Sequence, residues 1–143
     1  MGRIKNLDKL QKRLRSIGSA KAVKEVEGAL FAGADLVAAE AGLSITRGAV
    51  SGKNHVASAP GQPPNADSGV LDKGIGVYPV AGKTADGIEV TIVSTARYSE
   101  ALEFGTSKMS ARPFFRPARD KKKKAAKRLF NAAVAKIVKG AAE

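Results

Sequence analysis

The sequence predicts an α+β fold: a small antiparallel sheet packed with a long N-terminal helix and a C-terminal helix. Both ends of the chain show helical apolar spacing, the middle alternates at period two, and a long stretch before it shows neither period. Its 143 residues can support one hydrophobic core. We expect a single domain over 1–143, helical at 1–46, a long loop at 47–69, a sheet with a short helix at 70–112, and the C-terminal helix at 113–143.

Two helices are expected in the first segment. The first carries apolar residues at three- and four-residue spacing, with basic residues between them: Leu7, Leu10, Leu14 and Ile17. Gly18 and Ser19 interrupt this pattern, which resumes at Val23 and predicts a long helix over about residues 20–46. Glycine costs a helix up to about 1 kcal/mol relative to alanine. We therefore expect close packing against a neighbour at the three glycines within this helix: Gly28, Gly33 and Gly42.

The middle of the chain predicts a loop and then a hairpin. Residues 47–69 are rich in Gly, Ser, Ala and Pro, which indicates a long loop and a candidate contact arm. Alternation around Val77 and Val90, with Asp86 and Gly87 between the two runs, predicts two antiparallel strands. Pro79 should end the first strand or lie at a sheet edge.

The remaining elements are helical. Residues 98–104 predict a short helix that Gly105 would end. A three-and-four repeat of apolar residues runs from Ala126 to Val138 and predicts the last helix, beginning near Pro117, which is tolerated in a first turn.

Composition excludes several classes of site. The chain has no cysteine, so disulfides, thiolate metal sites and cysteine nucleophiles are excluded. Its first sixteen residues are too charged for a signal peptide, and no apolar run approaches the length of a membrane span, so we expect no membrane partner. Aromatic residues make up 5%, and the core must therefore consist mostly of aliphatic residues.

Candidate catalytic motifs are weak. Gly82-Lys83-Thr84 resembles the end of a phosphate-binding loop, but the earlier glycine that the motif requires is Val77 here. His55 is the only histidine and has no evident partner to orient it for acid–base work. Glu100 and Glu103 are more readily explained as ion-pair partners of nearby arginines. We expect no enzyme activity, no cofactor and no bound metal.

The net charge of +12 favours polyanionic partners. A basic run begins the last helix, and its lysines could contact DNA phosphates: Lys121, Lys122, Lys123 and Lys124. The simpler interpretation of the same run is a solvated helix face, because charge runs are commonly exposed surface. A basic DNA-binding protein is therefore the alternative interpretation of this chain.

Two blocks of sequence resemble a known family. The first block reads GQPPNADSGVL over residues 61–71. The second block reads Tyr98, then Glu103-Phe104-Gly105-Thr106, then Ala111-Arg112-Pro113-Phe114-Phe115-Arg116-Pro117-Ala118. Together they resemble the tail-completion, or head-to-tail joining (neck), family of long-tailed bacteriophages, the tail-component family founded on the tenth gene product of a lambdoid phage. The chain departs from the family pattern at two places. Ser99 stands where the family usually has alanine, and the start of the last helix is unusually rich in lysine.

The resemblance implies a non-enzymatic virion protein of the neck. It would assemble as a ring, commonly a hexamer, between the head connector or adaptor and the tail terminator or tail-tube protein. DNA would pass through the channel, and assembly would take place in the host cytoplasm.

On this interpretation the second block fastens copies to one another, or it is an internal corner between strand and helix. Two prolines fix its backbone and its aromatic rings offer apolar area, with one ring expected in the core. Its arginines could pair with Glu103 of the same or an adjacent subunit. Residues expected at the interface are Glu103, Phe104, Arg112, Phe114, Phe115 and Arg116, with Pro63, Pro64 and Asp67 from the loop.

Overall fold

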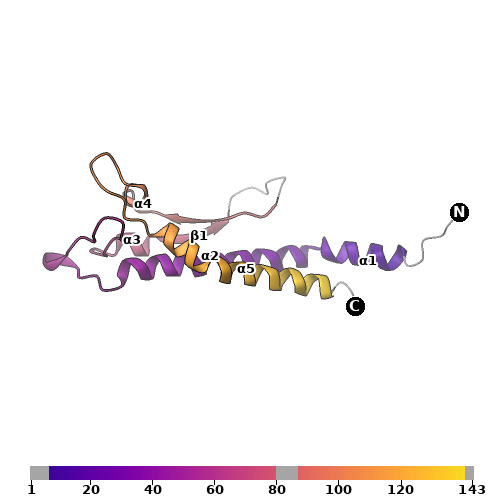
Figure 1. The fold of residues 1–143 in the computed structure, drawn as a ribbon. Coiled ribbons are helices and arrows are strands. Elements are labelled where there is room, and N and C mark those ends of the chain that lie inside the picture. Colours follow the sequence, from indigo (N-terminus) through magenta and orange to yellow (C-terminus); the bar gives the residue numbers. More distant parts are fainter. Residues whose placement is uncertain (1–6, 80–86, 141–143) are drawn as a thin grey trace.

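The computed structural model describes residues 7–79 and 87–140, and its architecture is α+β, as predicted (Figure 1). The described elements, in chain order, are α1 (Leu7–Ile17), α2 (Ala20–Thr46), the 3-10 turn η1 (Gly52–Asn54), α3 (Val70–Lys73), β1 (Ile75–Pro79), β2 (Val90–Ser94), α4 (Ser99–Phe104) and α5 (Phe115–Gly140).

Helices α2 and α5 form the long axis of the molecule and lie side by side in opposite directions (Figure 1). Ion pairs join them at two points, from Lys136 to Glu25 and from Lys121 to Glu40. Between these points Gly33 is buried, and a Cβ added to it would lie 3.1 Å from that of Ala126. The absence of a side chain therefore lets the two helices approach closely.

The prediction of close packing holds for Gly33 alone among the three glycines of α2. An added Cβ at Gly28 or Gly42 would meet nothing within 4 Å. The expectation for these two was wrong, because their positions on the helix do not face α5 at short range.

The sheet is a two-stranded antiparallel hairpin, β1 paired with β2, in which Val77 stands opposite Ile92. As predicted, β1 ends at Pro79. The expected turn at Asp86 and Gly87 lies partly outside the described residues. Ile75 and Ile92 on one face of the hairpin pack against the core.

The core lies where α2, α3, the hairpin and the start of α5 meet. Its buried members are Val37, Ala41, Ile45, Leu71, Ala96, Phe114 and Ala118. Helix α3, which the sequence analysis did not predict, supplies Leu71. Four residues are too few to show a helical repeat, and tertiary packing decides their conformation.

Helix α2 is long enough and apolar enough to cross a membrane by length and composition alone. The expectation that no segment approaches this length was wrong: residues 28–45 of α2 contain two charged residues, Asp35 and Glu40, and most of the others are Ala, Val, Leu, Ile or Phe. In the structure this helix packs against α5 and the hairpin, as the core helix of a folded domain does.

Candidate assembly site

The junction between α4 and α5 is organised by the carboxylate of Glu103. One oxygen, Oε2, accepts hydrogen bonds from the backbone N–H of Phe114 at 2.8 Å and of Phe115 at 2.9 Å, and the other, Oε1, accepts from Arg116 N–H at 2.9 Å. The first N–H groups of a helix have no partner within the helix, and a negative charge there also interacts favourably with the helix dipole. Glu103, only 7% exposed, is thus the cap of α5.

Sequence reasoning missed this role and paired Glu103 with arginines. Within the protomer its oxygens bond backbone amides instead; pairing with an adjacent subunit stays a prediction. A signal was present: no Ser, Thr, Asp or Asn stands in residues 111–114 before α5, so its first amides needed an acceptor from elsewhere.

Gly105 ends α4 and lets the chain turn back. Its φ is +77°, and an added Cβ would lie 2.9 Å from the backbone of Met109 and Ala111, so no other residue fits without strain. A tight turn follows, in which the N–H of Thr106 donates to the carbonyl of Met109 at 2.8 Å. The returning segment then docks on α4, where the N–H of Arg112 donates to Leu102 O at 2.7 Å.

The two adjacent phenylalanines have different environments. Phe114 is fully buried in the core, while Phe115 is partly buried and contacts it with ring centroids 4.5 Å apart and an interplanar angle of 35°. The expectation that one ring anchors the last helix in the core fits Phe114. Its burial leaves no surface for a partner in this conformation, whereas Phe115 keeps some.

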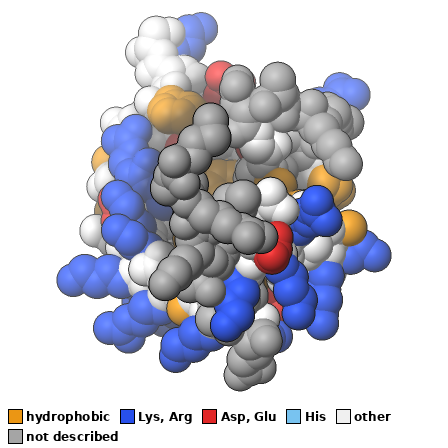
Figure 2. Space-filling view, turned by 90° about the vertical axis from the view of Figure 1, so that its right-hand side faces the viewer, with side chains coloured by type: hydrophobic (Ala, Val, Ile, Leu, Met, Phe, Trp, Pro, Cys, Tyr) orange, Lys and Arg blue, Asp and Glu red, His pale blue; other side chains and the backbone are white. Residues whose placement is uncertain are grey.

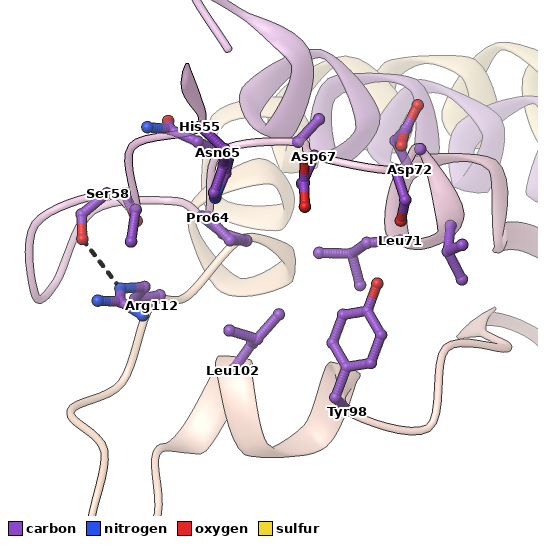
Figure 3. Close-up of a pocket in the computed structure, with 15 residues that line it drawn as sticks. His55, Ser58, Pro64, Asn65, Asp67, Leu71, Asp72, Tyr98, Leu102 and Arg112 are labelled. Atoms are coloured by element: carbon purple, nitrogen blue, oxygen red, sulfur yellow. Dashed lines mark hydrogen bonds between the residues drawn. The ribbon is translucent and has the colours of Figure 1, made fainter. Parts of the chain in front are cut away.

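The loop over residues 47–69 is bonded to this junction. Gly61 N–H donates to Ala111 O at 2.9 Å, and Arg112 Nε donates to Ser58 O at 3.0 Å (Figure 3). At the other side, Ala66 N–H donates to Ile45 O at the end of α2, at 2.9 Å. The two motif blocks, far apart in sequence, are therefore joined by a main-chain hydrogen bond from Gly61 to Ala111.

The loop residues expected at an interface lie at different depths. Pro64 is buried and Pro63 partly so, while Asp67 is exposed and its Oδ1 accepts the N–H of Gly52 at 2.9 Å. Asn65 Nδ2 donates to Val56 O at 2.8 Å. These bonds give the loop a defined shape against the body of the protomer.

A cavity of about 270 Å³ separates the loop from α4. Tyr98, directly before α4, and Leu102 within it point toward Leu71 across the cavity (Figure 3). Two buried oxygens in its wall, Ser58 Oγ and Asp72 Oδ1, have no hydrogen-bond partner among the described residues. In the same part of the chain, no group of three or more His, Asp or Glu residues could hold a metal ion.

A second hollow, which we call the apolar groove, has a volume of about 590 Å³ and lies between β2, α4 and the start of α5. Its walls include Ile92, Val93 and Phe104, and Phe104 is 66% exposed. Charged residues stand among its lining: Glu100, Glu103, Arg116 and Arg119. An open hollow with an exposed aromatic ring is typical of an interaction surface.

The four lysines of the basic run on α5 fall into two groups, one that pairs with an acidic residue and one that does not. Lys121 and Lys122 both pair with Glu40, the latter at 3.2 Å, and their hydrogen bonds hold the pKa of that carboxyl below its ordinary value. Lys123 and Lys124 are exposed, and no acidic residue in the described part of the chain pairs with them. Two of the four lysines predicted to contact DNA are thus engaged within the protomer.

Comparison with known families bears on this arrangement. Residues 8–105 match the family described as "Bacteriophage HK97-gp10, putative tail-component". The chain belongs to this family. No curated protein and no solved structure gives a significant match.

Membership in the tail-component family confirms the resemblance stated above and makes the chain a bacteriophage tail-component protein. The match covers the first motif block and the second as far as Gly105. Residues 111–118 lie beyond it, but the structure ties them to the matched part through Glu103 and Gly61.

Proposed function

We propose that this tail-component protein joins head and tail as a completion or neck component of the virion. In this role it forms a ring, with six copies as the expected number, between the head connector and the tail terminator or tail tube. It acts without bond-making chemistry. Family membership supports the placement in the virion, and the neck and the ring are our inference.

The observation that carries the proposal is how the motif residues are used. The carboxylate of Glu103 and the guanidinium of Arg112 bind backbone groups, so they fix the α4–α5 junction rather than present reactive atoms. What the junction leaves at the surface is the apolar groove and the ring of Phe104. Such a pattern suits assembly.

The residues expected at the interface divide accordingly. Buried Glu103, Phe114 and Pro64 would shape the contact surface from within. The exposed or partly exposed ones would touch partners directly: Pro63, Asp67, Phe104, Arg112, Phe115 and Arg116. Both strands of the hairpin also have an outer edge along which a neighbouring copy could pair.

The test is removal of the protein from a phage that encodes it. Electron microscopy of the lysate should show filled capsids and tails that are not joined, and expression of the chain in trans should restore joined particles. Infectious, joined particles formed without the chain would refute the proposal. Native mass spectrometry with purified tail tubes should show rings; monomers alone would count against a ring.

A second candidate function, DNA binding, is favoured by cations on α5 that pair with no acidic residue in the described part of the chain. Lys123, Lys124, Lys127 and Arg128 are exposed. Replacing these four by glutamine should weaken binding to duplex DNA and reduce its salt dependence, because each phosphate contact releases counterions. Replacing Lys121 and Lys122, which pair with Glu40, should have less effect on both. If the two sets of replacements weakened DNA binding equally, the exposed cations would not form a specific DNA-binding surface.

A further inference from the structure

Helix α1 has an apolar face that the described part of the chain leaves largely exposed. Leu10 is 50% exposed, Leu14 60% and Ile17 39%. The helix continues beyond α2, after the break at Gly18, and projects from the body of the molecule (Figure 1). Residues 8–17 of this helix add no side chain to the core.

An isolated helix of this kind is marginal in water. Below about 12–15 residues, hydrogen bonding within the helix does not offset the cost of nucleation, and stability comes from packing of an amphipathic face. α1 has 11 residues, and it alternates a leucine face with four basic residues. A partner that buries this face would therefore stabilise both the helix and the contact.

The apolar groove offers a surface for this helix on a different part of the same chain. Val93, 40% exposed, stands on β2, and the exposed ring of Phe104 stands on α4. α1 is about 16 Å long at 1.5 Å per residue, so three apolar side chains fall within a short contact. Donor helix and acceptor groove lie in separate regions of the protomer.

Charge is divided between these regions. α1 has four basic residues and α5 has ten, against one acidic residue in each, and Figure 2 shows Lys and Arg side chains surrounding the end where α1 projects. The described residues of 47–79 and 87–105 carry five acidic and four basic residues. This part is close to neutral, so it repels a basic helix less than the basic end of another copy does.

The groove itself has a mixed rim. Glu100 is exposed there and can receive a lysine or arginine of an incoming helix. Arg116 and Arg119 stand on the α5 side, and Arg119 Nη2 is paired with Asp120 at 2.8 Å. This favours an approach with the basic side of α1 toward α4.

We propose that α1 of one copy docks into the apolar groove of the next copy. The inference rests on the proposed ring and specifies its contact. Because two different surfaces of the chain meet, each copy donates one helix and accepts another, and a closed ring follows if the rotation between copies closes.

A cysteine pair tests the contact directly, because the chain has no cysteine of its own. Leu14→Cys and Phe104→Cys, prepared separately and mixed under mild oxidation, should give a disulfide-linked heterodimer identified by mass. The matched control replaces Leu14→Cys by Ser16→Cys, which is exposed on the same helix and, two residues from Leu14, lies on the opposite side. Crosslinking of the control as efficient as that of Leu14→Cys would overturn the proposal.

Complementation tests the same contact without covalent bonds. Leu14→Glu abolishes the donor, and Val93→Glu abolishes the acceptor, with Phe104→Glu as a second acceptor variant. By native mass spectrometry the wild-type chain should form rings and each variant should be monomeric. An equal mixture of Leu14→Glu and Val93→Glu should give heterodimers, because one intact donor and one intact acceptor remain. Circular dichroism verifies that each variant is folded.

The outcomes separate this inference from the ring proposal. If folded variants still form rings, α1 docking is overturned and the ring stands. If the mixture stays monomeric while the wild type forms rings, the donor–acceptor assignment is wrong. A wild-type chain that neither assembles nor crosslinks overturns the inference, while the particle experiment above still decides the role in head–tail joining.

Discussion

At the residue scale, Glu103 is the side chain on which the junction depends, and replacing it tests this. Glu103→Gln removes the charge at the start of α5 and leaves a single acceptor oxygen for three amides. Because charge-assisted hydrogen bonds are lost and buried donors are left unpaired, we expect a destabilisation of about 1–3 kcal/mol. Urea unfolding measures it.

The control for this variant is Glu100→Gln on the same helix, which removes an exposed carboxylate and should change stability by less than about 0.5 kcal/mol. Equal losses in the two variants would mean that Glu103 does not act as a cap. The sequence showed that Glu103 was special but not why, since the acceptor and its backbone donors are separated by eleven to thirteen residues.

The buried carboxylate of Glu40 predicts a dependence of stability on pH. Hydrogen bonds from Lys121 and Lys122 hold its pKa below the ordinary value of 4.5. A carboxyl whose pKa is lower in the folded state contributes stability that is present above the unfolded pKa and lost as the pH falls through the folded one. The free energy of unfolding should therefore decrease below about pH 4.5. Glu40→Gln should show a smaller decrease over that range; an unchanged slope would contradict the assignment.

At the element scale, the packing of α2 on α5 explains which glycine matters. Gly28→Ala adds a methyl group into open space and should stabilise the chain by about 0.5–1 kcal/mol through helix propensity. Gly33→Ala places a Cβ 3.1 Å from that of Ala126, and we expect overpacking to outweigh propensity, with a net loss of about 1 kcal/mol. Thermal unfolding compares the stabilities of the two variants. Equal stabilisation by both would show that α5 moves away from α2 to accommodate the added methyl group.

Elements with a long apolar period were predictable, and the rest were not. The limits of α1 and α2 and the end of β1 follow from periodicity, Gly18 and Pro79. Which of three glycines faces α5 depends on the crossing of two helices, which one sequence does not give. The expected loop was found at 47–69, but most of its attachment uses main-chain groups, as in the bond from Gly61 to Ala111, and these leave no pattern in side chains.

At the scale of the whole molecule, the core and the projecting helix are separable. All buried core residues follow Ala20, so deletion of residues 1–18 should leave the unfolding free energy within about 1 kcal/mol of the full chain while abolishing self-assembly. Urea unfolding and native mass spectrometry measure the two properties. A large loss of stability would mean that α1 is part of the folded body. The family was recognisable from two motif blocks, whereas the use of α1 depends on exposure that only the structure reveals.

The pairing of α2 with α5 also has a consequence for biosynthesis. During translation α2 is complete at Thr46, whereas α5 begins only at Phe115. The apolar face of α2 is therefore exposed while the residues between them are synthesised. Contacts between segments this distant form late and slow folding. Chains that end before residue 115 would expose the apolar face of α2, and they should aggregate or depend on chaperones. In the finished chain α5 covers this face.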